Sequence, residues 1–159
     1  MKISTKGRYG LIAIMDMAIF SKSDIVTLKS ISERQNISER YLEQIFSALK
    51  KGGIVKAKKG PQGGYYLDEE SYEFTIYDIL KILEGNLEVV NIEEKTNDME
   101  SFLCDNLWEN VNSIFYKYFN SIKLENLVKD YKEKKNDIMY YIYIKTTLNL
   151  KFKVVLIIF

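Results

Sequence analysis

Apolar positions spaced three and four residues apart predict four helices in the first half of the chain. The clearest lies between a cap at Ser38 and the pair Gly52-Gly53, and its apolar positions are Leu42, Ile45, Phe46 and Leu49. The other three are expected from residue 4 or 5 to residue 20, from 28 to 34 or 35 after a cap at Thr27, and from 76 to 84 between Thr75 and Gly85. Asn36 tolerates a left-handed backbone and is expected to turn the chain between the second and third helices.

Between the third and fourth helices the helical spacing gives way to alternation. Residues 54–58 alternate as a strand does, residues 59–64 carry the Gly and Pro of a tight turn, and residues 65–67 form the predicted return strand. Three helices followed by a hairpin is the order of a winged helix-turn-helix. The sequence therefore predicts a mainly α fold class, with a winged helix-turn-helix DNA-binding domain at residues 1–85 and a small β-hairpin wing.

One long predicted helix dominates the second half of the chain. Residues 86–97 are polar and acidic and are expected to form a linker, and residues 98–120 form a helix of about 34 Å. Its apolar residues include a series spaced alternately by three and four residues, which is typical of paired helices. We therefore expect a long C-terminal dimerisation helix; the alternative is a helix that packs only on its own chain. The predicted dimer contacts are Leu107, Trp108, Val111, Ile114, Phe115 and Tyr118.

The last forty residues carry a weaker pattern. A short helix is expected at residues 124–131, before the charged stretch 132–137, and we group residues 98–142 as the dimerisation helix and a C-terminal helical segment. Residues 143–159 are an unassigned apolar tail that alternates as a strand does. No function is predicted for this tail.

Composition narrows the class of protein. Apolar residues make up 47% of the 159 residues, enough for a sizeable core. A single Cys excludes an intrachain disulfide, and the absence of His removes the commonest general base and metal ligand. Neither a signal peptide nor a run of about 20 apolar residues is found, so we expect a soluble cytoplasmic protein with no membrane partner. Since no nucleophile–base pair or phosphate loop stands out either, we expect no enzyme.

Charge is distributed unevenly along the chain. Residues 1–64 carry 12 Lys and Arg against 5 Asp and Glu, whereas residues 65–159 carry 11 against 17. A basic half joined to an acidic half indicates that only the first half meets a polyanion, although a chance fluctuation would give the same pattern.

The third helix is the candidate recognition helix, because its polar side offers side chains that read bases. Arg40 can donate two hydrogen bonds to guanine, Gln44 can pair with an adenine edge, and Glu43 can accept from a cytosine amino group. Lys or Arg at positions 2, 6, 8, 29, 56, 58 and 59 can contact phosphates, and Lys59 at the glycine-rich wing can enter the minor groove. Any one of these residues alone would also fit an ordinary solvated surface. The predicted DNA-binding residues are Lys6, Arg8, Tyr9, Lys29, Ser38, Arg40, Tyr41, Glu43, Gln44, Ser47, Lys50, Lys58, Lys59, Gly60, Pro61, Gln62 and Gly63.

Four motifs in this order resemble the Rrf-two (Rrf2) family of bacterial regulators over residues 1–142. They are Ser4-Thr5-Lys6-Gly7-Arg8-Tyr9, Ile31-Ser32-Glu33-Arg34, Ser38 with Tyr41-Leu42-Glu43-Gln44, and Gly60-Pro61-Gln62-Gly63-Gly64-Tyr65. The resemblance implies a homodimer with crossed long helices that binds double-stranded DNA at a palindromic operator. It also implies that Tyr41, Glu43 and Gln44 lie in the major groove and Lys59 in the minor groove, where Arg is common in the family.

Iron–sulfur members of that family carry three cysteines between the fourth helix and the long helix, and this chain departs from them. It has Cys104 alone, and when Leu107-Trp108 is matched to the family's Leu-Trp pair the last cysteine position falls near Phe102. One thiolate cannot hold a cluster that usually takes four protein ligands, so no metal site and no cofactor are expected. The chain, including Met139-Tyr140-Tyr141-Ile142, is more similar to the cluster-free, cysteine-metabolism branch. That similarity implies regulation of cysteine or sulfur metabolism, with the enzyme cysteine synthase as a sensing partner.

The sequence thus predicts a sequence-specific transcriptional regulator, a repressor in the leading hypothesis. Two other functions stay open: a protein–protein regulator that acts through a metabolic enzyme, and an iron–sulfur-sensing regulator with an incomplete ligand set. Cys104 is either a redox sensor or a small core residue.

Overall fold

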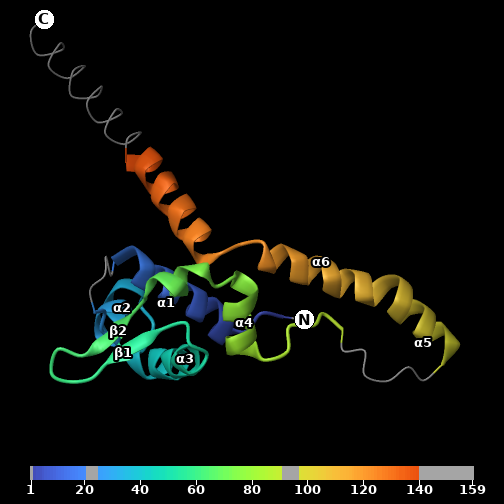
Figure 1. Ribbon diagram of the computed structural model, residues 1–159, viewed down its shortest axis with the longest axis horizontal. Helices are drawn as coiled ribbons and strands as arrows, with labels where there is room; N and C mark the ends of the chain where they lie inside the picture. Colours follow the sequence, from blue (N-terminus) through green and yellow to red (C-terminus); the bar gives the residue numbers. More distant parts are fainter. Residues whose placement is uncertain (1, 21–24, 91–96, 140–159) are drawn as a thin grey trace, which may run out of the picture.

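The structure, a computed structural model, describes residues 2–20, 25–90 and 97–139. The first half of the chain forms the predicted winged helix-turn-helix (Figure 1). Its elements are α1 (Thr5–Phe20), α2 (Leu28–Gln35), α3 (Glu39–Lys51), β1 (Lys56–Lys58), β2 (Gly64–Tyr66), the 3-10 helix η1 (Glu69–Glu73) and α4 (Ile76–Glu84). The predicted mainly α fold class is confirmed; β1 is two residues shorter than predicted, and β2 has the predicted length but lies one residue earlier.

Most of the predicted helix ends are confirmed by their hydrogen bonds. The Thr27 side chain accepts from the Ser30 N–H at 3.2 Å, and Asn36 takes the left-handed backbone at φ 54°. Thr75 and Asp78 cap each other reciprocally at the start of α4. The prediction for Ser38 is wrong in one respect, because its side chain makes no capping hydrogen bond. Ser38 is exposed, and at the start of α3 its backbone carbonyl, not its hydroxyl, accepts hydrogen bonds from the N–H groups of Tyr41 and Leu42.

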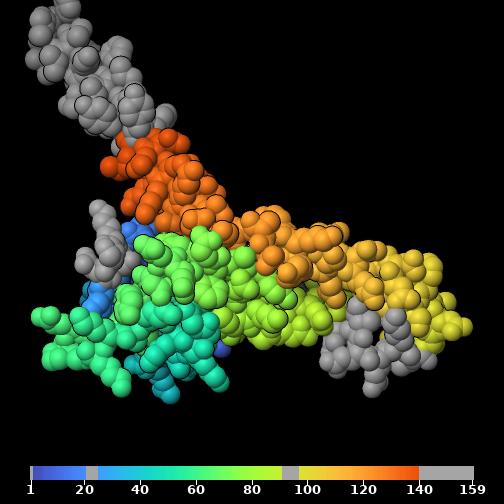
Figure 2. Space-filling model, in the orientation of Figure 1, coloured from blue at the N-terminus to red at the C-terminus, as the bar shows by residue number. Residues whose placement is uncertain are grey.

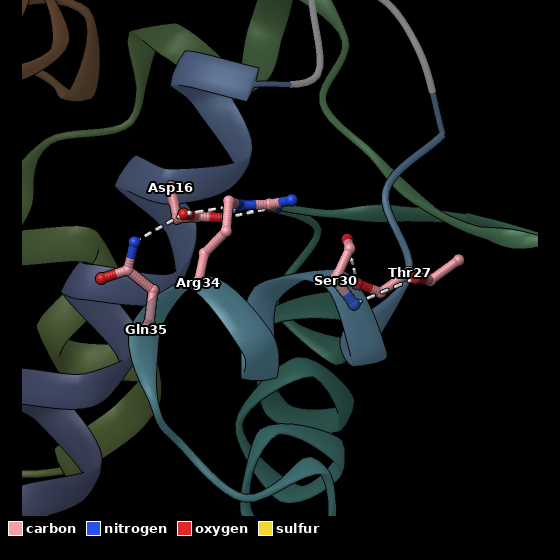
Figure 3. A network of polar contacts seen from close by, with 5 residues as sticks. All are labelled: Asp16, Thr27, Ser30, Arg34 and Gln35. Atoms are coloured by element: carbon pink, nitrogen blue, oxygen red, sulfur yellow. Dashed lines mark hydrogen bonds and ion pairs between the residues drawn. The ribbon is translucent and has the colours of Figure 1, made fainter.

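An ion pair inside the domain joins α1 to α2 (Figure 3). Asp16 is buried, and its carboxylate accepts from the Arg34 guanidinium at 2.6 Å and from the Gln35 amide at 2.6 Å. The Arg34 guanidinium also lies 4.8 Å from the centre of the Phe20 ring, within range of a cation–π contact. Because a buried carboxylate needs its partners, this cluster fixes α2 on α1.

The core of the first half is completed by residues from the far end of the chain. Fully buried side chains of α1 to α4 include Ile14, Met17, Ile31, Leu42, Phe46, Leu49 and Ile79. Leu124 and Val128 join the same cluster. Their approach is fixed by backbone hydrogen bonds from the Leu124 N–H to the Phe74 carbonyl and from the Ile76 N–H to the Ile122 carbonyl, at 2.9 and 2.8 Å.

The second half consists of two helices that reach away from the domain (Figure 1). The long helix covers the predicted range and is made of α5 (Asp98–Leu103), the π-helical segment η2 (Cys104–Trp108) and α6 (Glu109–Asn120). Residues 124–139 form a further helix, here called the C-terminal helix. The prediction that this helix ends at residue 131 is wrong, because the Lys- and Glu-rich stretch that follows has high helix propensity and continues it. The predicted strand at residues 143–159 lies outside the described residues.

Part of the expected linker packs against the long helix. Leu87 is buried in the core cluster. The Asn112 side chain on α6 accepts from the Val89 N–H at 2.8 Å and donates to the Val90 carbonyl at 3.0 Å. Residues 86–90 therefore connect α4 to α6 by defined contacts. Across the described ranges, no helix combines the length and apolar character needed to cross a bilayer.

Candidate nucleic-acid interface

The recognition-helix candidate α3 has two sharply different faces. Its four predicted core residues are fully buried, and one of them, Phe46, packs on the ring of Tyr65 in the wing at 4.8 Å between centroids. The opposite face is exposed, and its residues are Glu39, Arg40, Glu43, Gln44, Ser47 and Lys50. Since the buried face fixes the rotation of the helix, these polar side chains are presented together to solvent.

Tyr41 differs from its neighbours on α3. It is half-buried and packs edge-to-face on Tyr9 of α1, with ring centroids 6.0 Å apart. The contact leaves Tyr41 at the border between the core and the exposed face. It also ties the base-reading candidates to the first turns of α1, where Arg8 is exposed and Lys6 is half-buried.

The wing forms a tight turn with an exposed basic tip. Lys58, Lys59, Gly60, Pro61 and Gln62 are exposed, and Gly63 is half-buried. Gly60 takes φ 116°, and its carbonyl accepts from the Gly63 N–H at 2.9 Å. Side chains are excluded at Gly63, because a methyl group there would lie 2.4 Å from the Lys58 carbonyl oxygen. The turn thus needs glycine at two of its positions.

One lysine assigned to phosphate contacts has a partner inside the domain. The Lys56 ammonium lies 3.5 Å from the Asp68 carboxylate. A hydrogen bond from the Ser71 hydroxyl, with a smaller contribution from Lys56, lowers the pKa of Asp68 below its ordinary value. Lys56 therefore joins the wing to the segment that follows it. Of the three wing lysines that the sequence predicts as phosphate contacts, Lys58 and Lys59 remain as the candidates.

Val26, which the sequence did not indicate, helps to hold the wing in place. The backbone of Val26 exchanges two hydrogen bonds with Tyr65, at 2.8 and 2.9 Å, and so forms an isolated β-bridge beside β2. Because the Tyr65 ring also packs on Phe46, the wing is fixed both to α3 and to the segment before α2. Figure 2 shows α3 and the wing together at one end of the molecule, away from the long helix.

The predicted dimer contacts lie on an apolar face that the described chain leaves largely uncovered. Ile114 is 68% exposed and Tyr118 63%, and Leu107 is also exposed. Trp108, Val111 and Phe115 are half-buried. A shallow hollow on this face is lined by Val111, Ile114, Phe115 and Tyr118. The arrangement provides an apolar surface on the long helix.

Cys104 lies at the start of the π-helical segment and is buried. It is the chain's one cysteine, and the chain has no histidine. Among the described residues, no group of three or more His, Cys, Asp or Glu side chains is placed to hold a metal ion. An iron–sulfur cluster takes Cys thiolates and, in some centres, His, so this donor set does not fit one.

Known regulators are similar to most of this chain. IscR of Vibrio cholerae, an HTH-type transcriptional regulator, is 36% identical over 132 residues, which cover 82% of this chain and 76% of that protein. IscR of Vibrio campbellii is also 36% identical, with 82% and 79% of the two chains covered. These relatives are transcriptional regulators rather than enzymes, in agreement with the expectation from the sequence.

Some solved structures are similar to this chain in both sequence and fold. CymR, the global cysteine regulator of B. subtilis, superposes with a TM-score of 0.69 at 36% identity, covering 81% of this chain and 97% of that one. IscR of T. potens gives a TM-score of 0.67 at 37% identity, covering 84% and 90%.

The Rrf2 family model, described as an iron-dependent transcriptional regulator, matches residues 3–130. Iron held as an iron–sulfur cluster does not fit the donor set of this chain, which has one cysteine and no histidine. The extent of the match and the fold shared with CymR and with IscR of T. potens agree with this family. The chain belongs to the Rrf2 family and is a helix-turn-helix transcriptional regulator.

Proposed function

We propose that this regulator binds a palindromic operator as a homodimer and represses transcription from it in the cytoplasm. One observation carries the proposal: the buried face of α3 fixes Arg40, Glu43 and Gln44 on an exposed face beside a basic wing. The first turns of a recognition helix enter the major groove, and these side chains match the hydrogen-bonding edges of guanine, cytosine and adenine.

The wing and α1 supply contacts of a different kind. Lys59 enters the minor groove, while Lys6, Arg8, Lys29 and Lys58 bind phosphates and set the register of the protein on the duplex. The remaining predicted contacts, those of Tyr9, Ser38, Tyr41, Ser47, Lys50, Gly60, Pro61, Gln62 and Gly63, complete this surface. Phosphate contacts give affinity for any sequence, whereas the α3 side chains discriminate between sequences.

Dimerisation follows from the apolar face of the long helix. Paired long helices cover the exposed side chains of Ile114 and Tyr118 and carry two recognition helices on one two-fold axis. Half-sites of the operator are then expected about 34–36 Å apart, or a multiple of that spacing.

Two substitutions separate base reading from phosphate binding. The operator is obtained by selection from a random DNA pool, and binding is measured by fluorescence anisotropy at several salt concentrations. Gln44→Ala is expected to relax preference at one base step by about 1–3 kcal/mol. Lys59→Ala is expected to weaken binding to all sequences and to reduce the salt slope by about one. Lys132→Ala, at an exposed position of the C-terminal helix, serves as the control of equal charge change.

The results contradict the proposal in two cases. If Gln44→Ala weakens every sequence equally, α3 does not read bases at this position. If Lys59→Ala leaves both affinity and salt slope at the values of the control, the wing does not contact DNA.

We further propose that the regulated genes belong to cysteine or sulfur metabolism and that cysteine synthase is a sensing partner. The similarity to CymR, a global cysteine regulator, supports this, and so does a donor set unsuited to an iron–sulfur cluster. Genome-wide mapping of bound sites tests the regulated genes. Titration of the operator complex with purified cysteine synthase tests the partner, since a linked partner must change DNA affinity. Sites outside sulfur genes, or an unchanged affinity, would contradict the respective half of this proposal.

A further inference from the structure

The last turn of α4 lies on three glycines that belong to the two DNA-facing helices. A methyl group added at Gly52, at the end of α3, would lie 2.3 Å from Ile82 Cδ1. One added at Gly10 of α1 would lie 2.3 Å from Leu83 Cδ1. The third contact is between Glu84 and Gly7 of α1. The three consecutive α4 residues 82–84 thus each pack directly on a glycine.

Glu84 adds hydrogen bonds to this close approach. Its Oε1 accepts from the Ser4 hydroxyl at 2.7 Å and from the Ser4 N–H at 3.2 Å. The Ser4 hydroxyl in turn accepts from the Gly7 N–H at 3.2 Å, so that Glu84 completes the cap at the start of α1. Two residues of that start, Lys6 and Arg8, are proposed phosphate contacts.

The same turn is linked to the long helix. It ends at Gly85, where φ is 83°, and the chain then passes through buried Leu87 to the backbone atoms held by Asn112 of α6. The α4 helix therefore contacts α1, α3 and α6. Its last turn therefore lies between the DNA-facing helices and the residues that contact the long helix.

We propose that Ile82 and Glu84 are positioning residues for DNA binding: Ile82 sets the base-reading helix through Gly52, and Glu84 sets the phosphate-binding start of α1 through Ser4. The proposal rests on the DNA-binding function proposed above and assigns separate effects to the two side chains. Hydrogen bonds to bases weaken steeply with misalignment, whereas charge attraction to phosphates falls off gradually with distance. Displacement of α3 is therefore expected to reduce discrimination between operator and other DNA before it reduces overall affinity. Displacement of the start of α1 is expected to remove a phosphate contact.

The α3 arm is tested with two matched methyl deletions. Ile82→Val removes the methyl that lies over Gly52, and Ile79→Val removes the same methyl from a fully buried position of the same helix. The ratio of affinities for operator and scrambled DNA is expected to fall about fivefold in Ile82→Val and to stay unchanged in Ile79→Val. Gly52→Ala, which presses on Ile82 from the α3 side with an ordinary right-handed backbone, is expected to lower the ratio as well.

The α1 arm is tested with two neutral replacements of Glu84. Glu84→Gln keeps an oxygen that can accept from Ser4, and Glu84→Ala does not, while both remove the same charge. The salt slope for non-specific DNA is expected to be smaller by about one in Glu84→Ala than in Glu84→Gln, because one phosphate contact is lost. The operator-to-scrambled ratio is expected to be the same in the two variants.

Thermal unfolding of every variant separates positioning from loss of fold, since affinities are compared at temperatures where each variant is fully folded. The proposal is overturned if Ile82→Val and Ile79→Val change the ratio equally, or if Glu84→Gln and Glu84→Ala share one salt slope. Failure of the DNA-binding function is a different result, because the unsubstituted protein would then show no preference for any selected sequence.

Discussion

The two halves of the molecule bury their apolar side chains to very different extents. In the first half, the large apolar residues of α1, α3 and α4 converge on one core, and Phe46, Ile14 and Leu49 are entirely buried. Among the described residues of α5 and α6, none is buried, and Met99 at the start of the long helix is 76% exposed. Large contiguous apolar surface is uncommon on a monomer and marks a place of contact. The first half, together with Leu124 and Val128 of the C-terminal helix, therefore forms one buried core, whereas the long helix leaves an apolar face open to contact with another surface.

Polar contacts follow the same division. The first half contains the Asp16–Arg34 ion pair and two reciprocal caps, and none of the buried polar side-chain atoms among the described residues lacks a partner. The long helix is joined to that half by the ring contact between Tyr77 and Tyr116 at 4.7 Å, by the hydrogen bond from the Thr75 hydroxyl to the Asn120 side chain at 3.3 Å, and by the half-buried rings of Phe115 and Phe119. Changes in the core should then act on folding, and changes on the long helix on association.

The largest effect is expected from the core of the first half. Phe46→Ala removes a fully buried ring that also contacts Tyr65 of the wing, and should lower the free energy of unfolding by about 3–5 kcal/mol. Urea denaturation measures the change, and Ser47→Ala, at the exposed neighbouring position, is the control. If Phe46→Ala weakens dimerisation of the folded protein by as large a free energy as it lowers the free energy of unfolding, folding of the first half and association through the long helix are not independent.

A smaller loss is expected from the long helix, and it should appear in association rather than in folding. Ile114→Lys places a charge on the exposed apolar face, and two copies change in each dimer. The dimer dissociation constant should rise at least about 100-fold, because an Ile side chain contributes about 1.5–3 kcal/mol when buried. Analytical ultracentrifugation measures it.

The control for that change is Glu109→Lys, which also introduces a lysine, five residues earlier and about 140° around the helix, and changes the charge by more than Ile114→Lys does. It should leave the dimer intact. If Ile114→Lys and Glu109→Lys raise the dimer dissociation constant equally, the dimer contact does not lie on the face of the helix that carries Ile114.

The sequence predicted most of the first half because local signals and packing agree there. The spacing of Leu42, Ile45, Phe46 and Leu49 fixed which side of α3 faces the core, so the exposed face followed without coordinates. Thr27, Asn36 and Thr75 marked helix ends through side-chain chemistry that acts within three residues. Such signals can be read from a sequence because they do not depend on distant parts of the chain.

Contacts between distant residues could not be predicted in this way. Glu84 accepts from Ser4 across 80 residues, and Val26 pairs with Tyr65 through backbone atoms that carry no sequence signal. The π-helical segment at Cys104–Trp108 adds a local change of helical pitch that a pattern of apolar spacings does not resolve. The predicted end of the C-terminal helix at residue 131 is wrong for a different reason, because the charged stretch that follows is rich in Lys and Glu, which favour helix.

The smallest effect is expected at the joint between the wing and η1, and it depends on pH. Folding lowers the pKa of Asp68, through its hydrogen bond with Ser71 and then through Lys56, so the ionised form stabilises the fold. This stabilisation is present above the ordinary pKa of 3.8 and is lost as the pH falls through the lowered value. Asp68→Ala should therefore lower the free energy of unfolding by about 0.5–1 kcal/mol at neutral pH. This is the lower part of the range for loss of a helix cap, because the Asp68 side chain is partly exposed. The difference from the unsubstituted protein should shrink in acid, and urea denaturation between pH 3 and pH 7 follows it. The dimer dissociation constant should not change, since Asp68 lies beside the wing and not on the apolar face of the long helix. A dissociation constant that changes with this substitution would show that the wing and the long helix are coupled.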